Sequence, residues 1–262
     1  MQIPTVAIFG PTKHNETSQW MNEKSIIVKK DLDCQPCMKR TCPFGHHDCM
    51  KLIKDYEELK EAMILSYSSM PDAYWKENQI ESLINKFREG QVVIKINGIL
   101  AGCALSIVVD YDDFSDNHTY KEITQNYTFN SHNDNGDVLY GIDVFIKPEF
   151  RGLRLGRRLY DYRKELSERL NLKGVAFGGR IPNYHKYSTE LSPKEYIDKV
   201  RRKEIDDPVL NFQVSNDFHP SKILKNYLEG DEASNDFAVL LEWDNIYYEK
   251  PSKKAATKKK VV

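Results

Sequence analysis

The chain has 262 residues, of which 40% are hydrophobic and 29% are charged, and its formal net charge at pH 7 is −1. This composition suits one or two folded domains and gives no overall bias toward nucleic acid. The sequence has no apolar run of 18 residues, and its first ten residues lack the basic and hydrophobic parts of a secretory signal. We therefore expect no membrane span and a cytoplasmic protein.

The first 53 residues contain four closely spaced cysteines, Cys34, Cys37, Cys42 and Cys49. Two thiolates three residues apart on a tight turn can both face a tetrahedral zinc ion, so the first pair resembles half of a zinc knuckle. The second pair is less regular, with six residues between its members. Reduced thiols on a loop or disulfides are the alternatives to a structural zinc site formed by these four residues.

Two amphipathic helices and a hairpin are predicted next. Apolar residues recur at helical spacing over residues 54–70 and again over 78–88. Residues 91–97 and 102–110 then have the character of two strands, and Asn97 with Gly98 between them is typical of a tight hairpin turn.

The later part of the chain alternates loops with strands. Residues 111–137 are polar and predict a loop with a short helix, whereas 175–179 and 238–243 predict strands. Residues 251–262 carry five lysines and no acid, which indicates a solvated tail. No aromatic residues interleave these lysines, so the tail does not favour nucleic-acid binding.

The most informative segment is 138–160, which predicts a buried strand, a turn at Pro148, a glycine-bearing loop and an amphipathic helix. The first turn of a helix leaves backbone N–H groups without partners, and glycine allows a phosphate to approach them. Arginines gather at the same place, at Arg151, Arg154, Arg157 and Arg158. This pattern fits a diphosphate site, although an ordinary strand-to-helix turn with a solvated basic face is the alternative.

At this segment the chain resembles the GNAT superfamily of N-acetyltransferases. The acetyl-coenzyme A signature of that family is Gln or Arg, two residues, Gly, one residue, then Gly or Ala, and 151–156 fits it in frame. One position departs, because Arg154 stands at the inner glycine. The resemblance implies acetyl-CoA as the acyl donor, strand backbone contacts to its pantetheine arm and loop amides on its pyrophosphate. The implied cofactor-binding residues are Val144, Phe145, Ile146, Arg151, Gly152, Leu153, Arg154, Leu155, Gly156 and Arg157.

The resemblance extends over about 55–248 and implies the GNAT fold, an α/β fold. Its sheet is mixed and mostly antiparallel, with a splayed central strand pair flanked by helices. The chain is most similar to the GNAT domains that occur fused to a carbon–nitrogen hydrolase, in segments such as GDVLYGIDV at 136–144 and GGRIPNY at 178–184. We expect no such hydrolase here, since 262 residues leave no room for one. The expected domains are 1–53, 54–250 and the tail 251–262.

Residues 1–53 resemble instead the last part of heptosyltransferase-type glycosyltransferases. The chain begins at the strand that precedes FGPT, and a single strand with its loops cannot form the missing nucleotide-sugar domain. We therefore expect no glycosyl transfer by this chain alone, and interpret the segment as a remnant, a fusion scar or an error in gene delimitation.

Acyl transfer to an amine requires a neutral amine, donors for the oxyanion and a proton for the departing thiolate. The proton donor of many relatives is a tyrosine whose place is taken here by Gln213, and glutamine cannot act as an acid. Tyr184 and Tyr187 are the nearest substitutes along the sequence, although a tyrosine is more often a packed residue. Asp143 is the candidate base or amine-orienting carboxylate, unless it pairs with a structural arginine such as Arg180.

The expected function is N-acetyltransfer from acetyl-CoA to a small-molecule or peptide amine. The alternatives are a non-catalytic acyl-CoA-binding or sensor module and an accessory piece of a heptosyltransferase. The sequence gives no indication of the oligomeric state.

Overall fold

The computed structural model describes residues 6–9, 26–29, 56–67, 74–114 and 117–250. The predicted zinc ligands Cys34, Cys37, Cys42 and Cys49 and the basic tail lie outside these residues. No helix in the described parts of the chain is long and apolar enough to cross a membrane.

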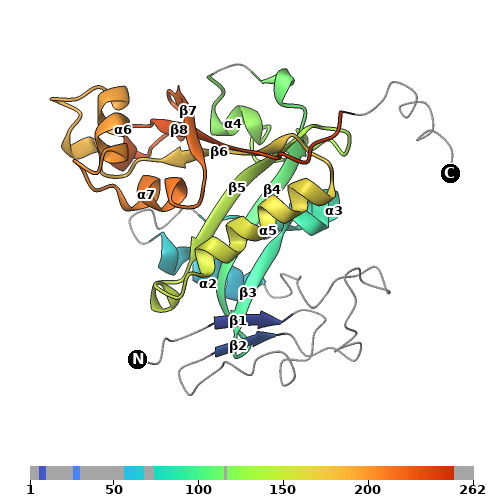
Figure 1. Ribbon diagram of the computed structural model, residues 1–262. Coiled ribbons are helices and arrows are strands. Elements are labelled where there is room, and N and C mark those ends of the chain that lie inside the picture. The colour runs from blue at the N-terminus through green and yellow to red at the C-terminus, as the bar shows by residue number, and fades with distance from the viewer. Residues whose placement is uncertain (1–5, 10–25, 30–55, 68–73, 115–116, 251–262) are drawn as a thin grey trace. The chain divides into compact units, whose positions relative to one another are not determined.

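Six strands are hydrogen-bonded in the order β3-β4-β5-β6-β8-β7, as Figure 1 shows. They are β3 (Val92–Ile96), β4 (Ile99–Val109), β5 (Val138–Ile146), β6 (Gly174–Arg180), β7 (His219–Leu224) and β8 (Ala238–Asp244). The pairs β3/β4, β6/β8 and β7/β8 are antiparallel, whereas β5 and β6 are parallel. The predicted mixed, mostly antiparallel α/β fold is therefore confirmed. A separate parallel pair joins β1 (Val6–Phe9) to β2 (Ile26–Lys29).

The chain divides into two compact units, and β4, β5 and the helix after β5 run from one unit into the other. The first unit comprises residues within 1–107, 120–133 and 141–161. Its helices are α2 (Tyr56–Ser66), α3 (Glu77–Phe87), α4 (Tyr120–Ile123) and the beginning of α5 (Leu155–Arg169). Leu59 and Met63 of α2 and Leu83 of α3 are fully buried, in agreement with the predicted apolar faces.

The hairpin β3–β4 turns at Asn97 and Gly98, whose φ angles are +51° and +83°. Two successive positive φ angles match a type I′ turn and account for the Asn-Gly sequence. β4 begins at Ile99, earlier than predicted, and includes Gly102. An added Cβ at Gly102 would lie 2.7 Å from the carbonyl oxygen of Phe145, so a glycine allows β5 to pass this close.

The second unit contains residues within 108–119, 134–140 and 162–262. Two short helices here were not predicted, α6 (Pro193–Arg201) and α7 (Pro208–Val214). Both begin with proline at the first helical position after a capping residue, Ser192 or Asp207. β7 was also missed, because Pro220 interrupts its apolar pattern; such a proline is tolerated at a sheet edge.

Candidate functional site

The loop between β5 and α5 has a left-handed backbone at two positions. Gly152 has φ +84°, and Arg154 has φ +58° although it carries a side chain. Arg154 occupies the inner glycine position of the signature, so the backbone keeps a left-handed conformation there at a cost on the order of 1–2 kcal/mol. Arg154 therefore adopts a backbone conformation that glycine reaches readily and that costs other residues free energy.

This loop presents backbone donors at the start of α5. The carbonyl of Arg154 accepts from the N–H of Arg158, so Arg154 precedes the first helical residue, Leu155. Nothing in the described residues accepts a hydrogen bond from the N–H groups of Leu155 and Gly156. Oriented N–H groups at a helix start, next to the exposed Arg154 and Arg157, suit an anionic group.

Arg151, the first signature residue, has a structural contact. Its Nε donates to the carbonyl of Ile146 at 3.3 Å and its Nη2 donates to the carbonyl of Ser66, also at 3.3 Å. Arg151 thereby fastens the end of β5 to the end of α2.

The edges of β5 can be assigned from its contacts with β4. The N–H of Lys147 donates to the carbonyl of Ala101 at 2.9 Å, and the carbonyl of Phe145 lies against Gly102. Because alternate residues of a strand direct their backbone groups to opposite edges, Val144 and Ile146 direct theirs away from β4. On that side, the parallel pairing of β5 with β6 covers only Val138–Tyr140 and ends there, as a splayed pair requires.

Asp143 lies half-buried on β5 and is held by two side chains. The hydroxyl of Tyr67 donates to Oδ1, and Nε1 of Trp75 donates to Oδ2 at 3.0 Å. The alternative partner Arg180 is engaged with Asp231, to which its Nε donates at 2.6 Å. Burial, and then the charge of Asp143, raise the pKa of Tyr67 well above its ordinary value.

Aromatic side chains surround this carboxylate. The ring of Trp75 lies 5.2 Å from that of Phe129, 6.0 Å from that of Tyr127 and 6.1 Å from that of Tyr120, measured between centroids. The loop that supplies two of them is strained, since Tyr127 and Phe129 both have positive φ angles. Strain of this kind persists only where surrounding contacts hold it, and here these contacts converge on Trp75.

Sequence reasoning missed Tyr67 and Trp75. Tyr67 was interpreted as an apolar position on the first helix, and Trp75 precedes the second. No spacing rule connects either residue to Asp143, which lies 76 residues after Tyr67 and 68 after Trp75.

The two tyrosines proposed from the sequence lie in an aromatic cluster of the second unit. Tyr184 is buried, and its hydroxyl donates to the carbonyl of Leu191 at 3.0 Å. The rings of Tyr184 and Tyr187 lie 5.3 and 5.6 Å from that of Tyr196. For Tyr184 this geometry favours the packing alternative, because its proton is already committed.

Gln213, which replaces the usual tyrosine, is only 5% exposed. Its Oε1 has no hydrogen-bond partner among the residues that the structure describes. An added Cβ at Gly179 would lie 2.4 Å from this oxygen, so the carboxamide lies directly against β6.

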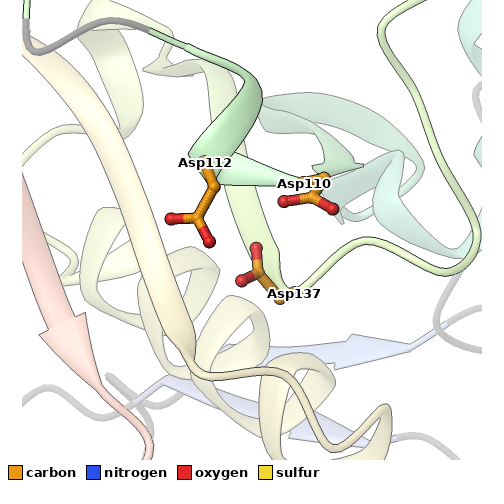
Figure 2. A group of neighbouring side chains, drawn as sticks. All are labelled: Asp110, Asp112 and Asp137. Atoms are coloured by element: carbon orange, nitrogen blue, oxygen red, sulfur yellow. The ribbon is translucent and has the colours of Figure 1, made fainter.

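Three carboxylates also gather in the second unit, those of Asp110, Asp112 and Asp137 (Figure 2). Their oxygens lie within 4.8 Å of one another. Asp137 already pairs with Lys173 and accepts from the N–H of Tyr111 at 3.0 Å. Its hydrogen bond raises the pKa of Lys173. These contacts fasten the loop that follows β4, and we assign no metal to the group.

Two family models match the chain. Residues 1–47 match "Glycosyltransferase family 9 (heptosyltransferase)", and residues 56–186, half of the chain, match "Acetyltransferase (GNAT) family". The N-terminal segment is also 48% identical over 68 residues to "Lipooligosaccharide heptosyltransferase 2" of Campylobacter jejuni, covering 26% of this chain and 21% of that protein.

Two curated relatives from Bacillus subtilis match the larger part. "Probable hydrolase YhcX" is 42% identical over 174 residues, which are 66% of this chain. The chain spans only 34% of the length of that relative. "Uncharacterized N-acetyltransferase YkwB" is 35% identical over 178 residues, 68% of this chain and 78% of the relative.

Solved structures agree on the fold. The loading GNATL domain of CurA from Lyngbya majuscula has a TM-score of 0.65 at 23% identity, covering 74% of this chain and 95% of that domain. The GphF GNAT-like decarboxylase in complex with isobutyryl-CoA has a TM-score of 0.60 at 15% identity, covering 72% of this chain and 94% of that one. With a GNAT signature between β5 and α5, a matching family model and a relative of similar extent, the chain belongs to the GNAT family of acetyltransferases.

Proposed function

We propose that the chain transfers an acetyl group from acetyl-CoA to a primary amine of a small molecule or peptide. The observation that carries this proposal is the loop from Arg151 to Arg157. Its left-handed Gly152 and Arg154 lead into a helix start whose N–H groups have no acceptor in the described chain. A diphosphate would supply those acceptors, and the exposed arginines would add charge-assisted bonds to it.

The proposed donor site includes the edge of β5 that faces away from β4, beyond its pairing with β6. The backbone groups of Val144 and the N–H of Ile146 point away from β4, so they are the groups that can pair with an extended pantetheine arm; the carbonyl of Ile146 accepts from Arg151. Of the strand residues expected to contact the cofactor, Phe145 instead directs its backbone toward Gly102. A thioester lying along this edge would be near Asp143, which precedes Val144.

Asp143 is proposed as the group that receives a proton from the attacking amine. It is half-buried, which leaves it reachable, and two donors fix its orientation. An amine held by this carboxylate would lie against the rings around Trp75, and aromatic faces attract ammonium groups.

Two matched variants test the donor site. Gly152 and Gly98 have φ angles of +84° and +83°, and an added Cβ at either would meet nothing within 4 Å. Alanine therefore imposes a similar backbone strain at both, but only Gly152 lies in the signature loop. We expect Gly152→Ala to weaken acetyl-CoA binding about tenfold or more in calorimetric titration, whereas Gly98→Ala binds as the parent does. Equal affinities in all three proteins would contradict the assignment.

Release of free CoA in the presence of a panel of primary amines tests the transfer itself. Amine-dependent CoA release above the rate with water supports catalysis. A second candidate is a non-catalytic acyl-CoA-binding module, which Gln213 favours because a carboxamide cannot supply a proton. Binding of acetyl-CoA without amine-dependent CoA release would support this candidate.

We also propose the domain division at residues 53 and 250, with the N-terminal segment contributing no acyl transfer. Limited proteolysis of the full chain, read by mass spectrometry, should release a resistant fragment that begins near residue 54.

The zinc ligation by Cys34, Cys37, Cys42 and Cys49 is proposed on their spacing alone. Metal content per chain, measured on protein without a histidine tag, decides it.

A further inference from the structure

We propose that Tyr67 is the catalytic acid that protonates the departing CoA thiolate, and that Asp143 returns a proton to it through their shared hydrogen bond. This inference rests on the proposed acetyltransfer. Tyr67, which follows α2, would then supply the proton donor that the chain lacks at Gln213 in α7.

Besides the hydrogen bond to Asp143, two contacts within the first unit fasten Tyr67 itself, and a third fastens the residue before it. Its N–H donates to the carbonyl of Met63 at 2.9 Å, which extends the last turn of α2. The preceding carbonyl, that of Ser66, accepts from Arg151 of the signature loop. Its ring meets that of Phe145 edge-on, at 6.0 Å between centroids and 70° between planes. Tyr67 thus follows a residue bound to the signature loop, and its ring and hydroxyl contact Phe145 and Asp143 of the strand expected to carry the thioester.

The hydroxyl of Tyr120, whose ring also contacts Trp75, is engaged elsewhere. Tyr120 donates to the carbonyl of Ile142 at 2.8 Å, which commits its proton to the backbone. Tyr67 donates to a carboxylate instead. A carboxylate can take up and give back a proton, whereas a backbone carbonyl cannot.

The proton transfers balance within this pair. The neutral amine attacks the thioester carbonyl carbon, forming the C–N bond and an oxyanion, and its nitrogen becomes positively charged. That nitrogen gives one proton to Asp143. The oxyanion then collapses, the C–S bond breaks with its electron pair on sulfur, and the sulfur takes the phenolic proton of Tyr67. The proton on Asp143 passes to the phenolate, so both residues end in their starting states and the products are the amide and CoA thiol.

The proton transfer from Asp143 back to Tyr67 is what allows a phenol to act as the acid in this reaction. A phenol, with an ordinary pKa of about 10, is a weaker acid than a thiol, at about 8.5, so proton transfer from an isolated tyrosine to a thiolate is uphill. Simultaneous transfer from protonated Asp143 removes that cost. Burial and the charge of Asp143 raise the pKa of Tyr67, so its proton is in place throughout the neutral range.

Trp75 provides the matched control, because it donates to the other oxygen of Asp143 but has no acidic proton to give. In this scheme Trp75 is a positioning residue. If Tyr67 also served only to orient Asp143, removing either donor would have comparable consequences.

The test compares Tyr67→Phe with Trp75→Phe in the full-length chain, using acetyl-CoA and the most active amine of the panel. We expect Tyr67→Phe to lower kcat about 100-fold, as loss of general acid catalysis does, with KM for acetyl-CoA within about twofold. Trp75→Phe should lower kcat less than tenfold. The parent and Trp75→Phe should show a solvent deuterium isotope effect on kcat that Tyr67→Phe lacks. Thermal unfolding checks that both variants are folded.

A kcat of Tyr67→Phe within twofold of the parent, or equal losses in the two variants with the isotope effect retained, overturns the assignment. If the parent binds acetyl-CoA but acetylates no amine, the slow hydrolysis of bound acetyl-CoA is compared instead, because thiolate release to water needs the same proton. Equal hydrolysis rates in the parent and Tyr67→Phe then reject Tyr67, whereas failure to bind acetyl-CoA rejects the proposed function itself.

Discussion

Two aspartates of this chain each accept a hydrogen bond from a tyrosine, yet their surroundings differ. Asp207 in the second unit is fully buried and accepts from the hydroxyl of Tyr196 at 2.7 Å. Three backbone N–H groups complete its contacts, those of Asn183, Val209 and Leu210. It caps α7 and joins that helix to the turn at Asn183. A buried carboxylate bound mainly by backbone amides holds a fold together.

Asp143 is only half-buried, and its identified donors are the side chains of Tyr67 and Trp75. The backbone nearby shows the same contrast. Arg154 is held in a left-handed conformation before α5, whereas α6 begins with Ser192 in a reciprocal capping box with Glu195. Asp143 on β5 is thus a half-buried carboxylate oriented by side chains, whereas Asp207 is a fully buried carboxylate bound mainly by backbone N–H groups. This difference supports the proposal that Asp143, on β5, takes part in the chemistry.

The largest expected effect is on stability, at Asp207. Asp207→Ala removes a helix cap and leaves buried donors without an acceptor, so we expect a loss of about 3 kcal/mol in the free energy of unfolding. Equilibrium unfolding in guanidinium chloride measures it. The neighbouring exposed Asp206, changed to Asn, should cost less than about 0.5 kcal/mol. A loss below about 1 kcal/mol for Asp207→Ala would break the comparison.

The next effect is on activity, at Asp143. Asp143→Asn keeps the size of the side chain but cannot take up a proton, so we expect kcat to fall about 100-fold. The free energy of unfolding should change by less than about 1 kcal/mol, because the side chain is half-exposed. Steady-state kinetics at saturating acetyl-CoA and amine, alongside denaturant unfolding, give both quantities. An unchanged kcat would remove Asp143 from the mechanism.

The tyrosine partners predict a dependence on alkaline pH. Burial and the neighbouring carboxylate raise the pKa of both Tyr67 and Tyr196 above the ordinary 10. The unfolded chain therefore releases protons above pH 10 that the folded chain retains. Stability has its full value below about pH 10 and falls as the pH rises further, by up to about 1.4 kcal/mol per pH unit for each tyrosine.

The free energy of unfolding, measured at pH 9 and pH 11, tests this dependence. In Tyr196→Phe it should fall less between the two pH values than in the parent. Identical slopes for the parent and Tyr196→Phe would show that this hydroxyl does not distinguish the folded from the unfolded state.

The smallest effect concerns the strain at Arg154. Arg154→Gly relieves a left-handed conformation, so we expect a gain of roughly 0.5–1 kcal/mol in stability. Acetyl-CoA affinity should fall by about tenfold, because one charge-assisted bond to the diphosphate is lost while the backbone donors remain. Asn97→Gly is the control at a similar φ of +51°; asparagine tolerates this conformation, and the gain should be smaller. Thermal unfolding and titration compare the two, and a loss of stability at Arg154→Gly would contradict the strain.

Much of the fold could be predicted because its signals are contiguous. The segment 138–160 was predicted to begin with a buried strand that ends before Pro148, and β5 spans Val138–Ile146. The hairpin turn at Asn97 and Gly98 follows from the φ angles that these residues tolerate. The helices α6 and α7 were missed although the sequence contains capping residues for them, Ser192 and Asp207. The strand β7 was missed because an edge strand with a proline shows little apolar alternation.

The sequence by itself determined the strand, loop and helix start from Val138 to Tyr160, since each depends on residues adjacent in the chain. It also pointed to Asp143, because an acid within an apolar strand is costly unless something holds it. Only the tertiary structure decided what holds it. Tyr67 and Trp75 reach Asp143 because α2 and the start of α3 pack beside β5, and contacts across 76 and 68 residues follow from that packing rather than from any local pattern.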